Sequence, residues 1–244
     1  MAFELPFLSS KTPPLIGLDI GSSSVKLVEL SQPSPGTVRL ERYAIEPLPR
    51  GAVVDGNFDK IDIVAEAVKR AWRRSGTRIK NVAMALPSSA VITKRIALPA
   101  NLREEEMEMQ VESEANQYIP FALDEVSLDF QVLGPIPNSP DDAEVLIAAS
   151  RKEKVEDRMA VAQIAGLKPM IIDVESYAMR GALERLIEQL PNRGEGLVIA
   201  AFYLGANSTT ATVMHDGEAI YERDQPFGGQ QLTSDIARAY GISV

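Results

Sequence analysis

Leu15-Ile-Gly-Leu-Asp-Ile-Gly-Ser-Ser-Ser-Val-Lys26 predicts a strand, a tight polar turn and the start of a second strand. The turn has the chemistry of a phosphate-binding hairpin. Gly21 lets the backbone approach an anion, and Ser22, Ser23 and Ser24 offer N–H and hydroxyl donors. Lys26 adds a positive charge, and Asp19 can orient a hydrated magnesium ion. These residues predict an anion site, but they do not specify a reaction.

The composition is that of a globular protein. The chain has 244 residues and is 45% hydrophobic, which is enough for one large domain or two smaller ones. Its 25 basic and 34 acidic residues give a net charge of −9, which argues against nucleic acid or an anionic membrane as the main partner. The absence of cysteine suits a reducing compartment such as the cytoplasm. No apolar run reaches the roughly 20 residues of a membrane span, so we expect any membrane association to be through partners.

The opening hairpin continues into an α/β unit. A third strand is predicted over residues 38–45, and apolar residues at helical spacing predict a helix over residues 60–75 that ends at Gly76. A buried strand follows at residues 82–86. Three antiparallel strands, a helix and a further strand predict a mixed sheet, with Trp72 in its core.

A second unit is predicted to begin near Val91. Its strand, helix and hairpin pair are expected at residues 91–98, 103–118, 126–133 and 144–149. Three prolines predict the loop of that hairpin: Pro135, Pro137 and Pro140. Four residues form one stripe of the helix and predict core packing: Met107, Val111, Ala115 and Tyr118.

The last part of the chain repeats the opening pattern. After a helix, a strand and a longer helix at residues 152–165, 170–174 and 175–190, Pro191-Asn-Arg-Gly-Glu-Gly196 is the clearest linker. Beyond it a strand leads into the polar turn Gly205-Ala-Asn-Ser-Thr209 and a second strand. Two hairpins of one kind suggest an internal duplication.

One such turn is weak evidence, because polar turns also simply reverse the chain, but two that each open a domain are more specific. The pair resembles the actin-like ATPase superfamily, which includes sugar kinases, DnaK-type chaperones and cell-division FtsA. Within it, nearly the whole chain resembles the type IV pilus assembly family PilM. Six segments carry this resemblance: Gly17-Leu-Asp-Ile-Gly-Ser-Ser-Ser-Val-Lys-Leu-Val-Glu29, Tyr43-Ala-Ile-Glu-Pro-Leu-Pro49, Ala90-Val-Ile-Thr-Lys94, Glu114-Ala-Asn-Gln-Tyr-Ile-Pro120, Ala148-Ala-Ser-Arg-Lys-Glu153 and Asp173-Val-Glu-Ser-Tyr-Ala178.

The resemblance implies an α/β, actin-like (ribonuclease H-like) fold with mixed sheets and a small FtsA-like insertion. We expect a flexible tail at residues 1–14, a first lobe at residues 15–90 and 169–195, the inserted subdomain at residues 91–168, and the start of the second lobe at residues 196–244. Since the family continues through the rest of the second lobe, the chain is expected to be C-terminally incomplete.

The resemblance also implies ATP and magnesium between the lobes. The residues it assigns to the nucleotide are Asp19, Gly21, Ser22, Ser23, Ser24, Lys26, Gly205, Ala206, Asn207, Ser208, Thr209, Gly228 and Gly229. Asp19 is also the expected metal residue, acting on magnesium through water. Gly228 and Gly229 belong to the segment Phe227-Gly-Gly-Gln-Gln-Leu-Thr-Ser-Asp-Ile236, which approaches the nucleotide in the superfamily; the alternative is a turn before an amphipathic helix.

Two further positions bear on hydrolysis. Glu175 stands where the superfamily places a water-orienting acid or amide, and is the catalytic candidate; a carboxylate that only stabilises a helix N-terminus is an equal alternative. Tyr203 stands where the family usually has an acid that positions the metal or its waters. A phenol carries no full charge, so we expect ATP binding with weak or absent hydrolysis.

The family resemblance implies a cytoplasmic scaffold at the inner face of the bacterial inner membrane. It would bind the cytoplasmic tail of PilN, between the first lobe and the insertion, together with other inner-membrane components of the pilus, and it could form homo-oligomers. Two alternatives stay open. One is an actin-like ATPase or kinase that turns over, and the other is an FtsA-like, membrane-associated filament former.

Overall fold

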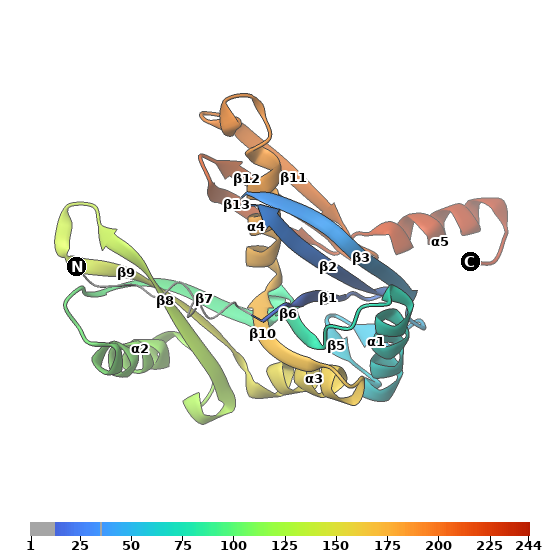
Figure 1. Ribbon diagram of the computed structural model, residues 1–244, viewed down its shortest axis with the longest axis horizontal. Coiled ribbons are helices and arrows are strands. Elements are labelled where there is room, and N and C mark those ends of the chain that lie inside the picture. The colour runs from blue at the N-terminus through green and yellow to red at the C-terminus, as the bar shows by residue number, and fades with distance from the viewer. Residues whose placement is uncertain (1–12, 35) are drawn as a thin grey trace.

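The computed structural model describes residues 13–34 and 36–244. Within these residues the chain forms a five-stranded sheet, two three-stranded sheets, a two-stranded hairpin and five α-helices (Figure 1). Residues 1–12 of the tail predicted over residues 1–14 lie outside the described residues. No helix of the described part is long and apolar enough to cross a bilayer.

The central sheet has the strand order β10-β6-β1-β2-β3. Its strands are β1 (Ile16–Ile20), β2 (Ser24–Ser34), β3 (Thr37–Pro47), β6 (Asn81–Leu86) and β10 (Lys168–Val174). The first three form an antiparallel meander, whereas β6 runs parallel to both β1 and β10. The sheet is therefore mixed, as predicted, and the carboxyl ends of β1, β6 and β10 meet at one edge.

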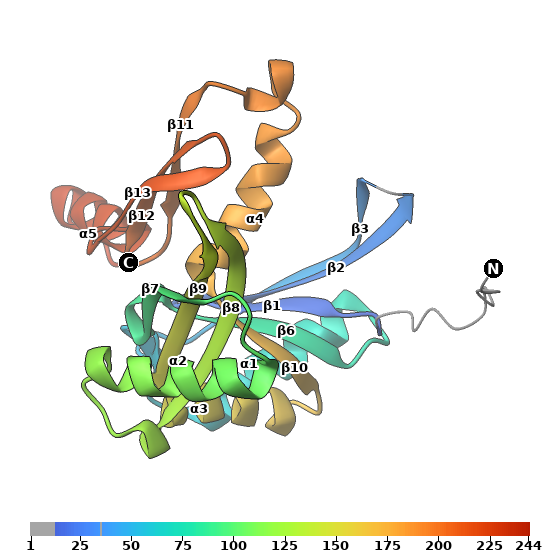
Figure 2. The ribbon, with the colours of Figure 1, turned by 90° about the vertical axis from the view of Figure 1, so that its left-hand side faces the viewer.

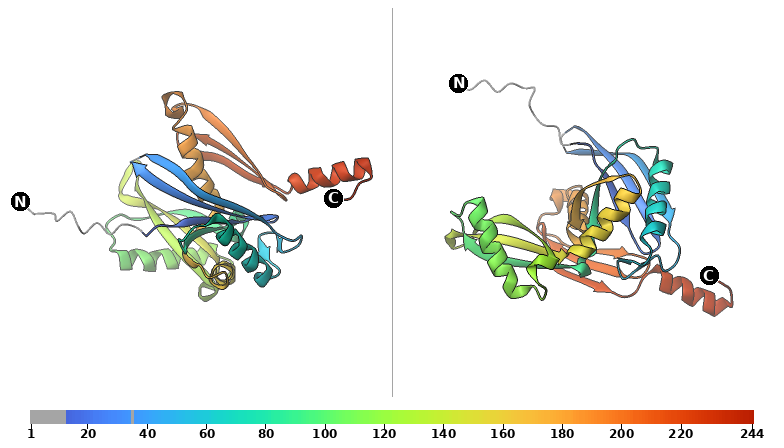
Figure 3. Two further views of the ribbon diagram at one scale, coloured as in Figure 1. Left: turned by 45° about the vertical axis from the view of Figure 1, so that its right-hand side comes forward. Right: turned by 90° about the horizontal axis from the view of Figure 1, so that it is seen from below.

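Two helices, α1 (Ile61–Ser75) and α3 (Lys152–Ile164), pack against the core of this sheet and against each other (Figure 3). The helical spacing predicted the buried face of α1, because its buried residues are Val64, Ala65, Ala67, Val68 and Ala71. Gly76 ends α1 in the left-handed conformation, as predicted. Trp72 packs partly buried against the core, and its Nε1 donates to the carbonyl oxygen of Ile79 at 2.9 Å.

A separate sheet has the order β7-β9-β8, formed by β7 (Val91–Pro99), β8 (Val126–Ile136) and β9 (Ser139–Arg151). Helix α2 (Glu104–Tyr118) packs on it through Met107, Val111 and Ala115. Figure 2 shows β8 and β9 running across the direction of β1 and β6. The second sheet and α2 thus have their own apolar core, distinct from that of the central sheet.

Two expectations for this unit are wrong. Tyr118 is 45% exposed and lies outside the core; the Nζ of Lys94 lies over its ring, 4.9 Å from the ring centre. Pro135 and Pro140 lie within β8 and β9, not in the loop between them. The pairing of β8 with β9 shifts register at that end, and a shifted ladder accommodates residues that cannot donate a backbone hydrogen bond.

The third sheet is the meander β11 (Val198–Leu204), β12 (Thr209–His215) and β13 (Glu218–Gln225), and α5 (Gly229–Tyr240) follows it. Helix α4 (Glu175–Ile187) leads to it from β10. The predicted linker is a packed turn that begins with the 3-10 segment Pro191–Gly194. A Cβ on Gly194 would lie 2.6 Å from Cγ2 of Ile187, so this turn is pressed against the end of α4.

Smaller elements connect these units. The hairpin β4 (Val53–Val54) and β5 (Asn57–Phe58) precedes α1, and 3-10 turns occupy Ser88–Ala90 and Leu123–Glu125.

Candidate functional site

The two polar turns, one after β1 and one after β11, are closed by the same hydrogen bond. The N–H of Gly21 donates to the carbonyl oxygen of Ser24 at 3.0 Å, and the N–H of Gly205 donates to that of Ser208 at 2.8 Å. A Cβ on Gly205 would come within 2.9 Å of the Ser208 oxygen, so the second turn requires glycine. The repeat seen in the sequence therefore extends to backbone geometry.

Asp19 and Lys26 are register partners across the first hairpin. The Nζ of Lys26 donates to Oδ2 of Asp19 at 2.7 Å, and a Cβ on Gly21 would be 3.8 Å from the same Nζ, so the ammonium lies over the turn. Burial lowers the pKa of Lys26, but the hydrogen bond and charge of Asp19 raise it, and the net pKa is above its usual value. Lys26 is therefore a cation at neutral pH, and both side chains stay about two-fifths exposed (41% and 44%).

Tyr203 brings the third sheet to this pair. Its phenol faces Lys26 and, after Asp19, helps to raise the pKa of that lysine. Its ring also borders the second turn, because a Cβ on Gly205 would be 3.8 Å from Cε1 of Tyr203. The residue found in place of the expected acid therefore lies between the two turns.

Glu175 is the first residue of α4 and directly follows β10, at the sheet edge where β1 also ends. Burial raises the pKa of Glu175, and the charge of Asp19 raises it further, against the charges of Arg158 and Lys26. The side chain still reaches solvent. It can therefore accept a hydrogen bond from water near Asp19, while its place at a helix N-terminus also favours the carboxylate.

Asp224 on β13 also belongs to this site, and the sequence reasoning missed it. Thr210 Oγ1 donates to Asp224 Oδ1 at 2.6 Å, and the register places Tyr203, Thr210 and Asp224 in one row across the third sheet. The charge of Asp224 contributes to the raised pKa of Glu175. The only signal in the sequence was an acid shortly before the Gly228-Gly229 pair.

The structure gives Gly228 and Gly229 a packing role. The N–H of Gly229 donates to the carbonyl oxygen of Gly205 at 2.9 Å, and the N–H of Gln230 donates to that of Ala206 at 2.8 Å. The first amides of α5 are thus directed at the second turn. Gly228 is buried against the same turn.

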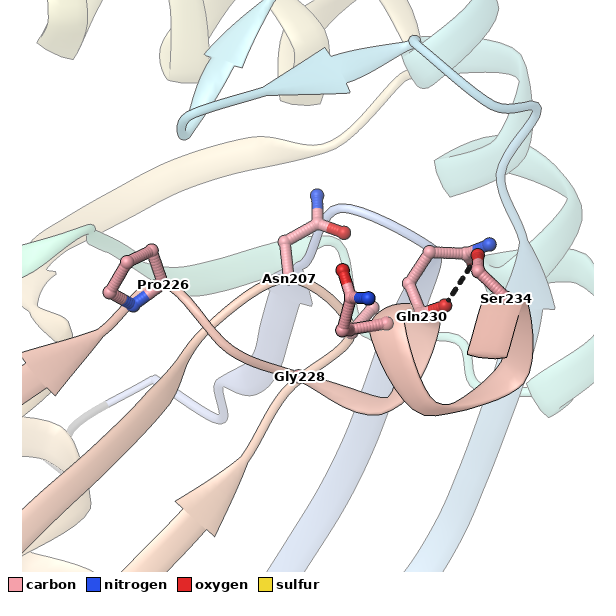
Figure 4. A pocket seen from close by; sticks show the side chains of 7 residues that line it. Asn207, Pro226, Gly228, Gln230 and Ser234 are labelled. Carbon is pink, nitrogen blue, oxygen red and sulfur yellow. Dashed lines mark hydrogen bonds between the residues drawn. The ribbon is translucent and has the colours of Figure 1, made fainter. Parts of the chain in front are cut away.

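A hollow of about 150 Å³ opens beside this contact, between the second turn and the start of α5 (Figure 4). Asn207, Gln230 and Ser234 line it, and the hydroxyl of Ser234 donates to the carbonyl oxygen of Gln230 at 2.9 Å. Small-molecule pockets usually exceed about 300 Å³. This hollow has room for part of a nucleotide.

The donor set suits a phosphate better than a bare metal. Two glycine-closed turns and the ammonium of Lys26 lie at the site, and a side chain on Gly205 would clash with its own turn. Within residues 13–34 and 36–244, no group of three or more acidic or histidine side chains is placed to hold a metal ion by itself. Magnesium would have to share its ligands with phosphate and water, which is its usual preference.

A second hollow, of about 400 Å³, lies between the β4–β5 hairpin and the β7-β9-β8 sheet; we call it the intersheet groove. Its apolar lining includes Ile92, Ile119, Phe121 and Val126. Its polar lining includes Asp55, Asn57, Arg151 and Lys154. The guanidinium of Arg151 lies 4.0 Å from the ring centre of Phe121, so charge and apolar surface adjoin in the groove.

Comparison with known proteins identifies the relatives of this chain. A family model described as type IV pilus assembly protein PilM matches residues 17–244. A solved PilM-PilN type IV pilus biogenesis complex contains a chain 31% identical, with a TM-score of 0.77, covering 94% of this chain and 66% of that one. The ethanolamine utilization protein EutJ from Carboxydothermus hydrogenoformans is 17% identical, with a TM-score of 0.54. That match covers 96% of this chain and 59% of the EutJ chain, and it supports the fold alone.

Cell division protein FtsA is also similar. The Enterococcus hirae and Enterococcus faecalis proteins are each 23% identical over 93% of this chain. The chain spans only about half of these relatives, 54% and 55% of their lengths. The predicted α/β, actin-like fold with mixed sheets is confirmed.

Proposed function

Because the chain belongs to the family of type IV pilus assembly protein PilM, we propose that it is a nucleotide-binding scaffold of the pilus machinery. It binds ATP with magnesium between the two polar turns and the cytoplasmic tail of PilN in the intersheet groove. It works in the cytoplasm, at the inner face of the inner membrane, which it reaches through its partners. The observation that carries the nucleotide assignment is that Lys26, Glu175 and Asp224, from three different elements, converge beside two turns closed in the same way.

Each residue of the site has a task in holding the nucleotide. Lys26 would supply positive charge over the first turn, and donors of Ser22–Ser24 and of Ala206–Ser208 would be directed at phosphate oxygens. The N–H of Gly205 and the hydroxyl of Thr209 instead donate within the protein and shape the second turn. Asp19 would orient the waters of a bound magnesium ion. When bound, ATP with magnesium supplies a phosphoryl group open to attack by water.

The residues favour holding ATP over hydrolysing it. Glu175 can orient a water, since its side chain is accessible and its pKa is raised. Tyr203, however, places a phenol against Lys26 where a carboxylate is expected. ATP then acts as a structural ligand or a switch.

Titration calorimetry with ATP and magnesium tests the nucleotide assignment. Lys26→Met should weaken binding about tenfold or more, because one charge-assisted phosphate contact is lost. Lys69→Met is the matched control, since Lys69 lies on α1 and pairs with Glu66. Equal affinity of the two variants would contradict the assignment.

The intersheet groove supports the partner assignment. It joins apolar surface to Arg151 and Lys154, which suits a short peptide with apolar side chains and at least one acidic or carbonyl group. A synthetic PilN tail, labelled and titrated with the protein, should bind and protect the groove from hydrogen exchange. Protection confined to the third sheet would refute the placement.

A further inference from the structure

Arg158 on α3 is a buried charge that neither candidate site uses directly. It is 4% exposed, and in residues 13–34 and 36–244 no carboxylate lies within ion-pair distance. Its Nε donates to the carbonyl oxygen of Ala85 at 2.9 Å and its Nη2 to that of Gly56 at 3.2 Å. Its guanidinium also lies 4.8 Å from the ring centre of Phe58. A buried charge held by two carbonyl groups and a ring is costly unless those contacts are kept.

One end of this arrangement is a wall of the intersheet groove. Gly56 lies between Asp55 and Asn57, and both neighbours line the groove. A Cβ on Gly56 would lie 2.7 Å from Cγ of Pro87, so the β4–β5 turn is pressed against the start of Ser88–Ala90, which also contributes to the lining. Arg158 therefore holds the groove wall in place through the Gly56 carbonyl.

The other end is the nucleotide site. Ala85 is the register partner of Asp173 on β10, two residues before Glu175. Burial lowers the pKa of Arg158, and the negative charges of Glu175, Asp157 and Asp19 act against that lowering. Of these acids, Glu175 and Asp19 lie at that edge of the sheet. Arg158 thus stands between the acids of one site and the wall of the other.

We propose that Arg158 couples the two sites, so that nucleotide and peptide tail weaken each other's binding. Polyphosphate beside Asp19 and Lys26 adds negative charge on the side of Ala85. It draws the guanidinium toward that edge and away from Gly56, whose hydrogen bond is the longer of the two. The groove wall loosens and the tail binds less tightly. By linkage, a bound tail lowers the affinity for nucleotide by the same factor.

The coupling rests on the proposed function. The test measures the affinity for the PilN tail with and without saturating ATP and magnesium. We expect ATP to weaken tail binding at least about fivefold in the unaltered protein, which is the lower end of the usual range of coupling. Arg158→Met should bring this ratio close to one. Arg158→Lys keeps the charge and should keep a reduced ratio of the same sign. Arg103→Met, an exposed change directly before α2, should leave the ratio unaltered.

The outcomes distinguish a failure of the proposed function from a failure of the coupling through Arg158. If the unaltered protein binds neither ligand, the proposed function fails. If it binds both with a ratio near one, or with the opposite sign, the coupling is overturned. If Arg158→Met lowers both affinities but preserves the ratio, Arg158 only supports the fold and the proposal is wrong. Should Arg158→Met not fold, Arg158→Lys decides, and a ratio equal to that of the unaltered protein overturns the coupling.

Discussion

Gly228 and Ala206 are packed so closely that a Cβ on Gly228 would lie 2.5 Å from the Ala206 carbonyl oxygen. The same Cβ would be 2.7 Å from the oxygen of Gly205. With the backbone hydrogen bonds from Gly229 and Gln230, this contact joins the start of α5 to the second polar turn. The glycine pair therefore shapes the turn, whatever further contact it makes with a nucleotide.

Gly228→Ala should destabilise the protein and distort the second turn, because the new methyl group meets backbone atoms that cannot rotate away. Overpacking of this kind costs about 1–3 kcal/mol, or roughly 2–12 °C in Tm for a chain of this size. Gly229→Ala is the control, since its Cβ would be 3.8 Å from the Gly205 oxygen, an ordinary van der Waals contact. Thermal unfolding of both variants measures the difference, and equal Tm values would contradict the packing argument.

Tyr203→Asp should increase phosphate release from ATP about tenfold or more, because it restores a carboxylate that can position magnesium or its waters. Tyr203→Phe should leave release as slow as in the unaltered protein. The measurement is a phosphate-release assay with purified proteins. Brisk release from the unaltered protein would show that the phenol does not limit hydrolysis.

Glu175→Gln should change how stability depends on pH. The pKa of Glu175 is raised, so the folded state binds its proton more tightly than the unfolded state. Stability from this group is present at low pH and is lost as pH rises through the folded pKa. Relative to the unaltered protein, Glu175→Gln should be slightly more stable at about pH 7, and the advantage should vanish near pH 4.

This effect is small because the Glu175 side chain still reaches solvent. Denaturant unfolding of both proteins at the two pH values measures it. A loss of stability that is the same at both pH values would instead indicate a lost hydrogen bond.

Phe121→Ala should weaken binding of the PilN tail about tenfold or more, as expected for an aromatic side chain in a peptide groove. Met109→Ala is a suitable control, because Met109 is 63% exposed on α2 and lies outside the groove lining. Fluorescence anisotropy with a labelled tail reports both affinities. If both variants lost the same amount of tail affinity, the tail would bind outside the groove.

Local patterns predicted the elements of this fold well. The helical spacing in α1, the glycine that ends it and the two glycine-closed turns are all properties of short segments. The sequence also predicted strand β11, which carries Tyr203 toward the first hairpin.

Contacts between distant segments were not predictable. Arg158 is 102 residues from Gly56 and 73 from Ala85 along the chain, and nothing around it in α3 marks it as buried. Asp224 was not predicted as a site residue, because only the pairing of β12 with β13 places it beside Thr210. Tyr118 followed the helical spacing but is the last residue of α2, and its side chain stays 45% exposed beside Lys94 of β7.

The packed turn at Pro191–Gly194 moves together with the end of α4. No residue of α4 is fully buried, while its far end is fixed to the turn through Ile187 and Gly194. Thirteen residues of helix span about 20 Å, so tilting α4 by about 10° about its first residue would carry the turn about 3.5 Å. Glu175 is that first residue. If a partner bound the exposed Leu186 and Leu190 and tilted α4, it would reorient the Glu175 carboxylate without contacting the nucleotide site.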